Sequence, residues 1–168
     1  CVAQHIGVKM RVVEVMRRYA IGDLSVDMDR LPGEKVVITQ AMDATKASLS
    51  AINMEIKRLA AAAAAGDFSQ RGAEEAYSHD FRQMVATLNQ LMATCEGNLG
   101  QLSGLLRAIA GGDLTHTMQG QFNGVFAQMR DDANTTVANL TGIVGRIQQA
   151  SSSITTAASE IANGNADL

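Results

Sequence analysis

One short motif occurs three times in this sequence, as Ile21-Gly22-Asp23-Leu24-Ser25, Ala65-Gly66-Asp67-Phe68-Ser69 and Gly111-Gly112-Asp113-Leu114-Thr115. The second residue of each copy is a glycine, and these glycines, Gly22, Gly66 and Gly112, are 44 and 46 residues apart. A second landmark follows each copy, because Met42-Asp43, Leu88-Asn89 and Ala133-Asn134 stand 21, 23 and 22 residues after the glycine. Two landmarks that keep their spacing three times indicate three structural repeats along the chain.

Between the landmarks, apolar residues recur at alternating steps of three and four, which is the heptad period of packed helices. We call these three rows the seams. The first seam consists of Ile38, Met42, Thr45, Leu49, Ile52, Ile56 and Leu59. The second consists of Phe81, Val85, Leu88, Met92, Cys95, Leu99, Leu102, Leu106 and Ile109. The third consists of Phe126, Met129, Ala133, Thr136, Leu140, Ile143, Ile147, Ala150, Ile154, Ala157 and Ile161. Each long helix is therefore predicted to begin after one Gly-Asp motif and to continue to the next, and a first helix is predicted over residues 2–20.

The motif glycines Gly22, Gly66 and Gly112 are predicted to end helices, because glycine adopts the left-handed conformation that closes a helix. The segments of about 11 to 14 residues that follow them carry periodic apolar residues, so we expect them to pack against the helices. We expect Leu24, Phe68 and Leu114 to be the anchors of these connectors, inserted between helices. An extended segment of eleven residues reaches about 36 Å, so the two helices that it joins can run parallel.

The predicted fold class is all-α. Two parallel helices from one chain cannot enclose seams this apolar, whereas a second copy of the chain completes a four-helix bundle. We therefore expect a parallel homodimer in the form of an elongated rod, with the apolar residues of the seams as its core.

Composition and charge argue against several other classes of protein. Fourteen basic and seventeen acidic residues give a net charge of −3, which offers no general attraction to nucleic acid or to an anionic membrane. Only 4% of the residues are aromatic, and no run of about 18 apolar residues exists that could span a bilayer. Cys1 and Cys95 form no CxxC pair, so a reducing cytoplasm is expected. The chain has no initial methionine and ends inside a helical pattern, which favours an excised piece of a longer protein.

No catalytic, cofactor or metal site is predicted. The three histidines are dispersed, without a second ligand at metal-binding spacing. There is no Gly-x-x-x-x-Gly-Lys phosphate loop and no identifiable nucleophile triad. Cys95 lies on the second seam, where a small buried apolar side chain is the expected role.

A helix, a connector that opens with Gly-x-Leu, and a second helix with a hydrophobic-Asn pair, all within about 50 residues, resemble the HAMP domain of bacterial receptors and sensor kinases. All three repeats resemble it, and the best local match is Leu88-Asn89-Gln90-Leu91-Met92. We therefore expect three concatenated modules at residues 1–50, 51–96 and 97–141. The third repeat looks like the last HAMP domain before the output domain of a methyl-accepting chemotaxis protein. Residues 142–168 are accordingly expected to begin the signalling helix, since residues 157–168 are similar to the start of that output hairpin.

The sequence departs from the family pattern at two places. Family members next to a membrane carry a proline early in the first helix, whereas the single proline here, Pro32, lies in a connector. The acid-Glu-x-Gly motif that opens the second helix is degraded, and its nearest counterpart is Pro32-Gly33-Glu34, which would give Glu34 the regulatory role of the family's acid. The missing proline suggests modules placed inside a cytoplasmic array.

The resemblance implies signal relay without catalysis and without a cofactor. An upstream cytoplasmic sensor, such as a PAS domain, would supply the signal, and the output would control a histidine kinase through an adaptor protein. No nucleic acid and no direct membrane contact are expected. The alternatives are a HAMP relay of a sensor histidine kinase or cyclase, and a helical ligand-binding sensor. A ligand sensor would need converging polar groups, and the seams offer only Thr45 and Thr136.

Overall fold

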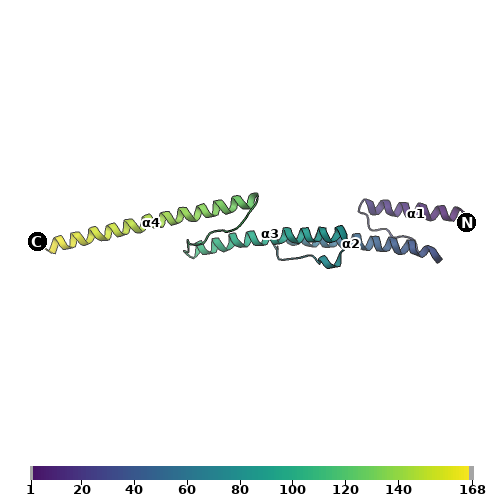
Figure 1. The fold of residues 1–168 in the computed structure, drawn as a ribbon, viewed down its shortest axis with the longest axis horizontal. Helices are drawn as coiled ribbons and strands as arrows, with labels where there is room; N and C mark the ends of the chain where they lie inside the picture. The colour runs from purple at the N-terminus through teal and green to yellow at the C-terminus, as the bar shows by residue number, and fades with distance from the viewer. Residues whose placement is uncertain (1, 167–168) are drawn as a thin grey trace. The chain divides into compact units, whose positions relative to one another are not determined.

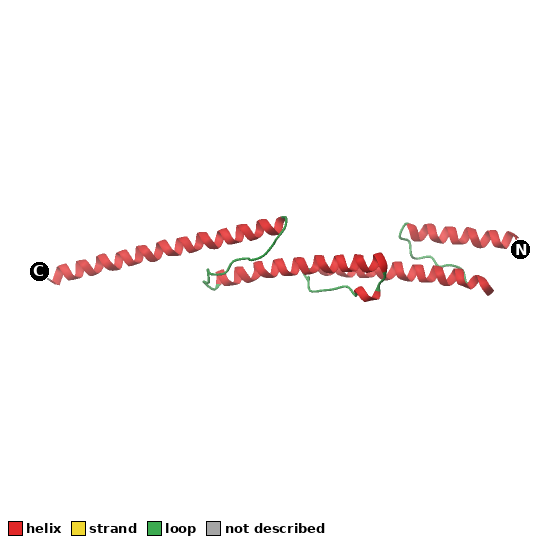
Figure 2. Ribbon diagram, in the orientation of Figure 1, coloured by secondary structure: helices red, strands yellow, loops and turns green. Residues whose placement is uncertain are grey.

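The computed structural model describes residues 2–166, and over that range it contains helices and connecting segments only. In this part of the chain there are four α-helices, drawn in Figure 2: α1 (Val2–Ala20), α2 (Val36–Ala64), α3 (His79–Ala110) and α4 (Val125–Ala166). The all-α prediction is confirmed. Cys1 and the last two residues of the predicted signalling helix lie outside the described residues.

Two short 3₁₀ turns lie in the connectors, and the sequence pattern does not predict them. The turn η1 (Gly33–Lys35) leads directly into α2, and η2 (Glu74–Ala76) lies between α2 and α3. A turn of three residues is too short to produce an apolar period, so the seam pattern could not reveal either one.

The chain forms two compact units, Cys1–Ala93 and Thr94–Leu168. In the first unit, the connector after α1 runs back along that helix, so α2 begins beside the start of α1 and runs in the same direction (Figure 1). The connector after α2 places the first part of α3 in the same way. The parallel course expected from the length of the connectors is therefore what the structure shows.

The first unit has its core between helix and connector. One buried cluster joins Val15 and Tyr19 of α1, Met28 of the connector and Met42 of α2. Further along, Leu59 of α2 and Val85 of α3 are almost completely buried.

The second unit repeats this arrangement with the end of α3 and the beginning of α4, which again run in the same direction (Figure 1). Its buried cluster joins Leu105 of α3, Met118 and Phe122 of the connector, and Val137 of α4. The guanidinium of Arg130 lies 5.8 Å from the centre of the Phe122 ring, close enough for a cation–π interaction. In both units the connector is therefore part of the core.

No helix in the described range has both the length and the hydropathy that a bilayer span requires.

Candidate functional site

The three connectors begin with the same hydrogen-bonded turn. Gly22, Gly66 and Gly112 have φ values of 82°, 80° and 83°, in the region that favours glycine. The aspartate after each glycine donates its backbone N–H to the carbonyl five residues earlier, at 2.9 Å in all three cases. This closure satisfies a carbonyl that the helix end would otherwise leave unpaired. The glycines therefore end α1, α2 and α3.

The side chains of these aspartates form the next turn. Oδ1 of Asp23, Asp67 and Asp113 accepts the backbone N–H of the residue two positions later at 3.0, 3.0 and 2.9 Å. The hydroxyl of that residue, a serine or threonine, donates to the same oxygen at 2.5, 2.6 and 2.6 Å. Hydrogen bonds to the charged form favour it, so the pKa of each of the three carboxyls lies below its ordinary value.

The three expected anchors are half-buried. Leu24 packs against the core cluster of the first unit and Leu114 against that of the second, and Phe68 is half-buried in the connector of the second repeat. The deepest position in each connector comes four residues later. There Met28, Gly72 and Met118 are buried.

Seven residues before each motif glycine, the preceding helix contributes a further buried side chain: Val15, Leu59 and Leu105. The three repeats therefore share a core position on the helix as well as one on the connector. Val15 and Leu105 do not lie on a predicted seam, whereas Leu59 does.

In the second and third repeats an asparagine of the following helix binds the connector backbone. Oδ1 of Asn89 accepts the N–H of Gly72 at 2.6 Å, and its Nδ2 donates to the carbonyl of the same residue at 3.0 Å. Asn134 makes the same pair of bonds with Met118, at 2.8 and 3.1 Å. We call this two-bond contact the amide clamp. It gives a structural role to the hydrophobic-Asn pair of the sequence.

The first repeat has Asp43 where the others have asparagine. Here a threonine hydroxyl, that of Thr39, binds the connector backbone instead. Oγ1 of Thr39 accepts the N–H of Leu31 at 3.2 Å and donates to the carbonyl of Asp29 at 2.7 Å. Thr39 is only 2% exposed. Neither the motif nor the seam predicts a role for Thr39, although a threonine three residues before Met42, and thus on the same helix face, is a usable signal.

A second left-handed residue lies at or shortly before the start of each following helix. Gly33, His79 and Gly124 have φ values of 59°, 49° and 57°. They occupy the stretch where the family motif places its glycine, so His79 holds a glycine conformation without being glycine. Glu34 lies in η1 with an exposed side chain.

The residues predicted as a dimer core differ in how far one chain covers them. Met42, Ile52, Val85 and Met92 are buried. Half-buried are Ile38, Leu49, Ile56, Phe81, Leu88, Cys95, Leu102, Ile109, Phe126, Met129 and Leu140. Exposed are Leu99, Leu106, Ile143 and Ile147. A large part of the seam surface thus lies open on the single chain.

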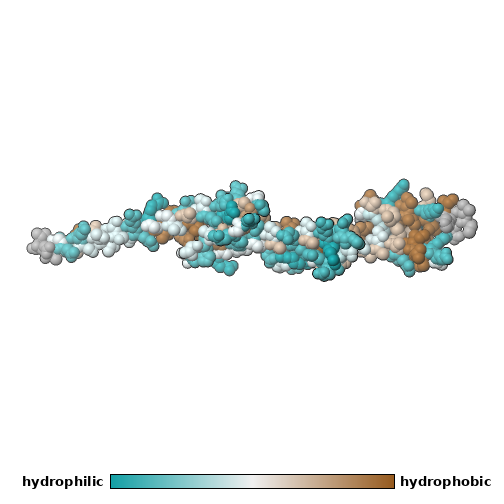
Figure 3. Space-filling model, viewed as in Figure 1, coloured by the Kyte–Doolittle hydropathy of each residue, from teal (hydrophilic) through white to brown (hydrophobic). Residues whose placement is uncertain are grey.

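Apolar side chains are also exposed outside these seams. Ile6, Met10 and Val13 recur at steps of four and three on α1 and are exposed. Figure 3 shows apolar surface gathered over α1 and the beginning of α2. The first unit therefore presents an apolar helix face of its own.

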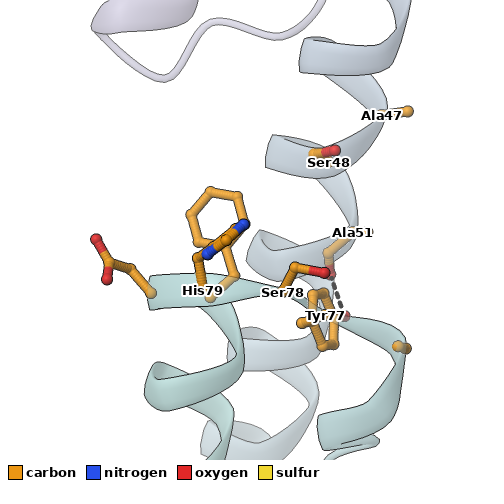
Figure 4. Close-up of a pocket in the computed structure, with 9 residues that line it drawn as sticks. Ala47, Ser48, Ala51, Tyr77, Ser78 and His79 are labelled. Carbon is orange, nitrogen blue, oxygen red and sulfur yellow. Dashed lines mark hydrogen bonds between the residues drawn. The ribbon is translucent and has the colours of Figure 1, made fainter.

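An open groove lies where α2 passes the start of α3, and Figure 4 shows it. Ala47, Ser48 and Ala51 line it from α2, opposite Tyr77 and His79. The hydroxyl of Tyr77 donates to the carbonyl of Ala51 at 3.2 Å, which ties the end of the connector to α2. Within the described residues no three His, Cys, Asp or Glu side chains come together as metal ligands. The arrangement therefore offers packing and hydrogen bonding, and the groups that recur between repeats are those that hold the connectors.

Comparisons with known proteins agree with this geometry. The family model described as HAMP N-terminal domain 3 matches residues 8–50, and the model described as HAMP domain matches residues 76–142. Residues 51–75 lie outside both matches. The matched family is non-enzymatic.

The chain is also similar to methyl-accepting chemotaxis protein McpB of Pseudomonas aeruginosa, with 42% identity over 103 residues. The aligned part covers 61% of this chain and 15% of that protein. The chain therefore contains HAMP domains and is related in sequence to a bacterial chemoreceptor.

Proposed function

We propose that this chain is the signal-relay region of a bacterial chemoreceptor, built from three HAMP modules at residues 1–50, 51–96 and 97–141, with residues 142–168 beginning the signalling helix. The observation that carries the proposal is the recurrence of one connector geometry in all three repeats. The family models cover most of the first and third repeats, and the second has the same glycine turn, aspartate turn and amide clamp as the third. These shared contacts support counting the second repeat as a module.

The functional unit of the proposal is a parallel homodimer. Leu106 of the second seam is 56% exposed and Ile147 of the third is 63% exposed on the single chain. Apolar rows of this length are unfavourable in water, and each buried Leu or Ile side chain contributes about 1.5 to 3 kcal/mol. A second copy with the same orientation would bring identical seams to the same height. This makes the second copy the partner that the surface fits.

The mechanism is a shift between two packings of each bundle. An upstream sensor, which we propose to be PAS-like, would favour one packing of the first module through rotation or tilt of its helices. The connectors, held through residues such as Leu24, Phe68 and Leu114, would keep the helices of each module in step. The output would control a histidine kinase through an adaptor protein in the cytoplasm.

Light scattering on the 168-residue chain tests the dimer. We expect twice the mass of one chain, and we expect Leu106→Lys to shift the protein toward monomer because it places a charge in the proposed core. Met54→Lys is the matched control, since Met54 is 72% exposed and lies on the opposite face of its helix from the seam residues Ile52 and Ile56. A monomeric wild-type chain, or equal effects of the two substitutions, would contradict the proposal.

Cysteine crosslinking tests the parallel orientation. In a Cys1→Ser variant, Cys95 is the single cysteine and lies half-buried on the second seam. Parallel helices would bring the two copies of Cys95 to the same height, so oxidation should give a disulfide-linked dimer. A dimer by light scattering that never crosslinks through Cys95 would argue for an antiparallel arrangement.

A further inference from the structure

Besides the neutral hydrogen bonds of Thr39, the first repeat ties its connector to the following helix by charged side chains of that helix at positions where the other two repeats are uncharged. In the second and third repeats the clamping asparagine is followed three residues later by a buried apolar residue, Met92 after Asn89 and Val137 after Asn134. In the first repeat the corresponding two residues are charged, Asp43 and Lys46.

Both charged residues form ion pairs with the connector. Asp43 pairs with Arg30. Nζ of Lys46 lies 2.7 Å from Oδ1 of Asp27 and donates to the carbonyl of Val26 at 3.2 Å. The earlier connector residue pairs with the later helix residue, as expected for two segments that run in opposite directions. We call the two pairs, Asp27–Lys46 and Arg30–Asp43, the ionic ladder.

A third ion pair holds the same stretch from the other side. Nε of Arg11 in α1 lies 3.3 Å from Oδ1 of Asp29. Nη2 of the same side chain donates a hydrogen bond to the carbonyl of Asp27 at 3.1 Å. The first connector is thus held by opposite charges on both flanking helices.

These charges are accessible to solvent ions. On the connector, the side chains of Asp27 and Arg30 are 65% and 72% exposed, and their partners on α2, Lys46 and Asp43, are 23% and 37% exposed, so each pair has one side open to solvent. Salt screens exposed ion pairs strongly, because the Debye length falls from about 10 Å at 0.1 M to about 3 Å at 1 M.

The amide clamps of Asn89 and Asn134 are part-buried and carry no net charge. The charged side chains of Arg58 and Glu55 also reach the second connector, but there they bind the backbone of Arg71 and Ala73, where salt screening acts less than on a pair of opposite charges.

We propose that the ionic ladder makes the first connector selectively releasable by ionic strength, while the amide clamps hold the second and third connectors in place. Within the relay function proposed above, on which this consequence rests, the first module is the one whose packing responds to the salt concentration around it. The release of the connector is a property of the chain and can be measured without a receptor.

Hydrogen exchange of the 168-residue chain at about 0.1 M and about 1 M sodium chloride tests the proposal. We expect the amides of residues 24–31, including the N–H of Leu31 that binds Thr39, to exchange at least about fivefold faster at the higher salt concentration. Peptides over residues 70–76 and 114–122 of the same molecules are internal controls and should change by less than about twofold. Equal acceleration in all three connectors, or no acceleration in the first, would overturn the proposal.

Two variants locate the effect in the ladder. Asp43→Asn combined with Lys46→Met installs the residue types of the second repeat, and it should remove the salt response. Lys57→Met removes a charge from an exposed position on α2 outside the ladder, and it should leave the response intact. Persistence of the response in the double variant would also overturn the proposal. Light scattering tests the dimer separately. If hydrogen exchange shows no selective salt response, the relay proposal therefore still stands, and if light scattering shows a monomer, the ionic ladder can still respond to salt.

Discussion

The side-chain amide of Asn89 forms two hydrogen bonds with one residue of the connector, accepting from the N–H of Gly72 at 2.6 Å and donating to its carbonyl at 3.0 Å. An amide has a donor and an acceptor side by side, so it can pair with a backbone in this way, whereas a carboxylate only accepts. The clamp therefore fixes the position of the connector along the axis of α3.

We expect Asn89→Asp to destabilise the chain by about 1 to 3 kcal/mol, because it keeps the acceptor but removes the donor to Gly72 and to Oε1 of Glu74. Urea unfolding measures the loss. Asn53→Asp makes the same exchange at an exposed position of α2 and should cost less than about 0.5 kcal/mol. Similar losses for the two variants would show that the clamp contributes nothing specific.

We expect Gly72→Ala to destabilise by about 1 to 3 kcal/mol through overpacking. A Cβ at this position would lie 2.5 Å from Cγ1 of Val85 and 3.0 Å from Oε1 of Glu55. Gly100→Ala is the matched control, since its Cβ meets nothing within 4 Å, and it should stabilise α3 by about 0.5 to 1 kcal/mol. The melting temperature should therefore fall for Gly72→Ala and rise for Gly100→Ala. A combined Gly72→Ala and Val85→Ala variant should recover part of the packing, and a failure to do so would contradict the steric cause.

The aspartate turns predict a dependence of stability on pH. The hydroxyl of Ser69, followed by the amide of Gln70, holds the pKa of Asp67 below its ordinary value of 3.8, and Ser25 and Thr115 do the same for Asp23 and Asp113. A carboxyl whose pKa is lowered by folding stabilises the fold above the unfolded pKa, and this contribution is lost as pH falls through the folded pKa.

We therefore expect the melting temperature to fall below about pH 4. A variant with Ser25→Ala, Ser69→Ala and Thr115→Ala should be less stable at pH 7 and should approach the wild type as the pH falls through this range. A constant difference between the two proteins at every pH would show that the hydroxyl bonds do not act through the carboxylates.

Helix geometry predicts how the relay responds to insertions in α3. One residue inserted near Gly97 rotates the following part of the helix by about 100°, whereas seven residues restore the heptad face with a drift of about 20°. In a receptor of the kind proposed above, the single insertion should fix kinase output in one state. The seven-residue insertion should keep at least part of the response to stimulus. If the two behave alike in a kinase assay, the seam does not carry the signal.

The sequence by itself determined the repeats and the ends of the first three helices, because both follow from local rules. A glycine that adopts positive φ readily closes the end of a helix, and α1, α2 and α3 end directly before the motifs of Gly22, Gly66 and Gly112. The heptad steps of the seams are likewise a property of one helix, and α2, α3 and α4 contain them in full.

Only the tertiary structure decided which residues hold each connector. Leu24 and Met28 look alike in the sequence, yet Met28 lies deepest, because the connector folds back to place it between Val15 and Met42. Thr39 and the ionic ladder depend in the same way on which residues come to one height when two segments run in opposite directions. A periodic pattern shows which face of a helix is apolar. It does not show the register of an extended connector along that face, that is, which connector residue packs beside which helix residue. Contacts between residues distant in the sequence set this register.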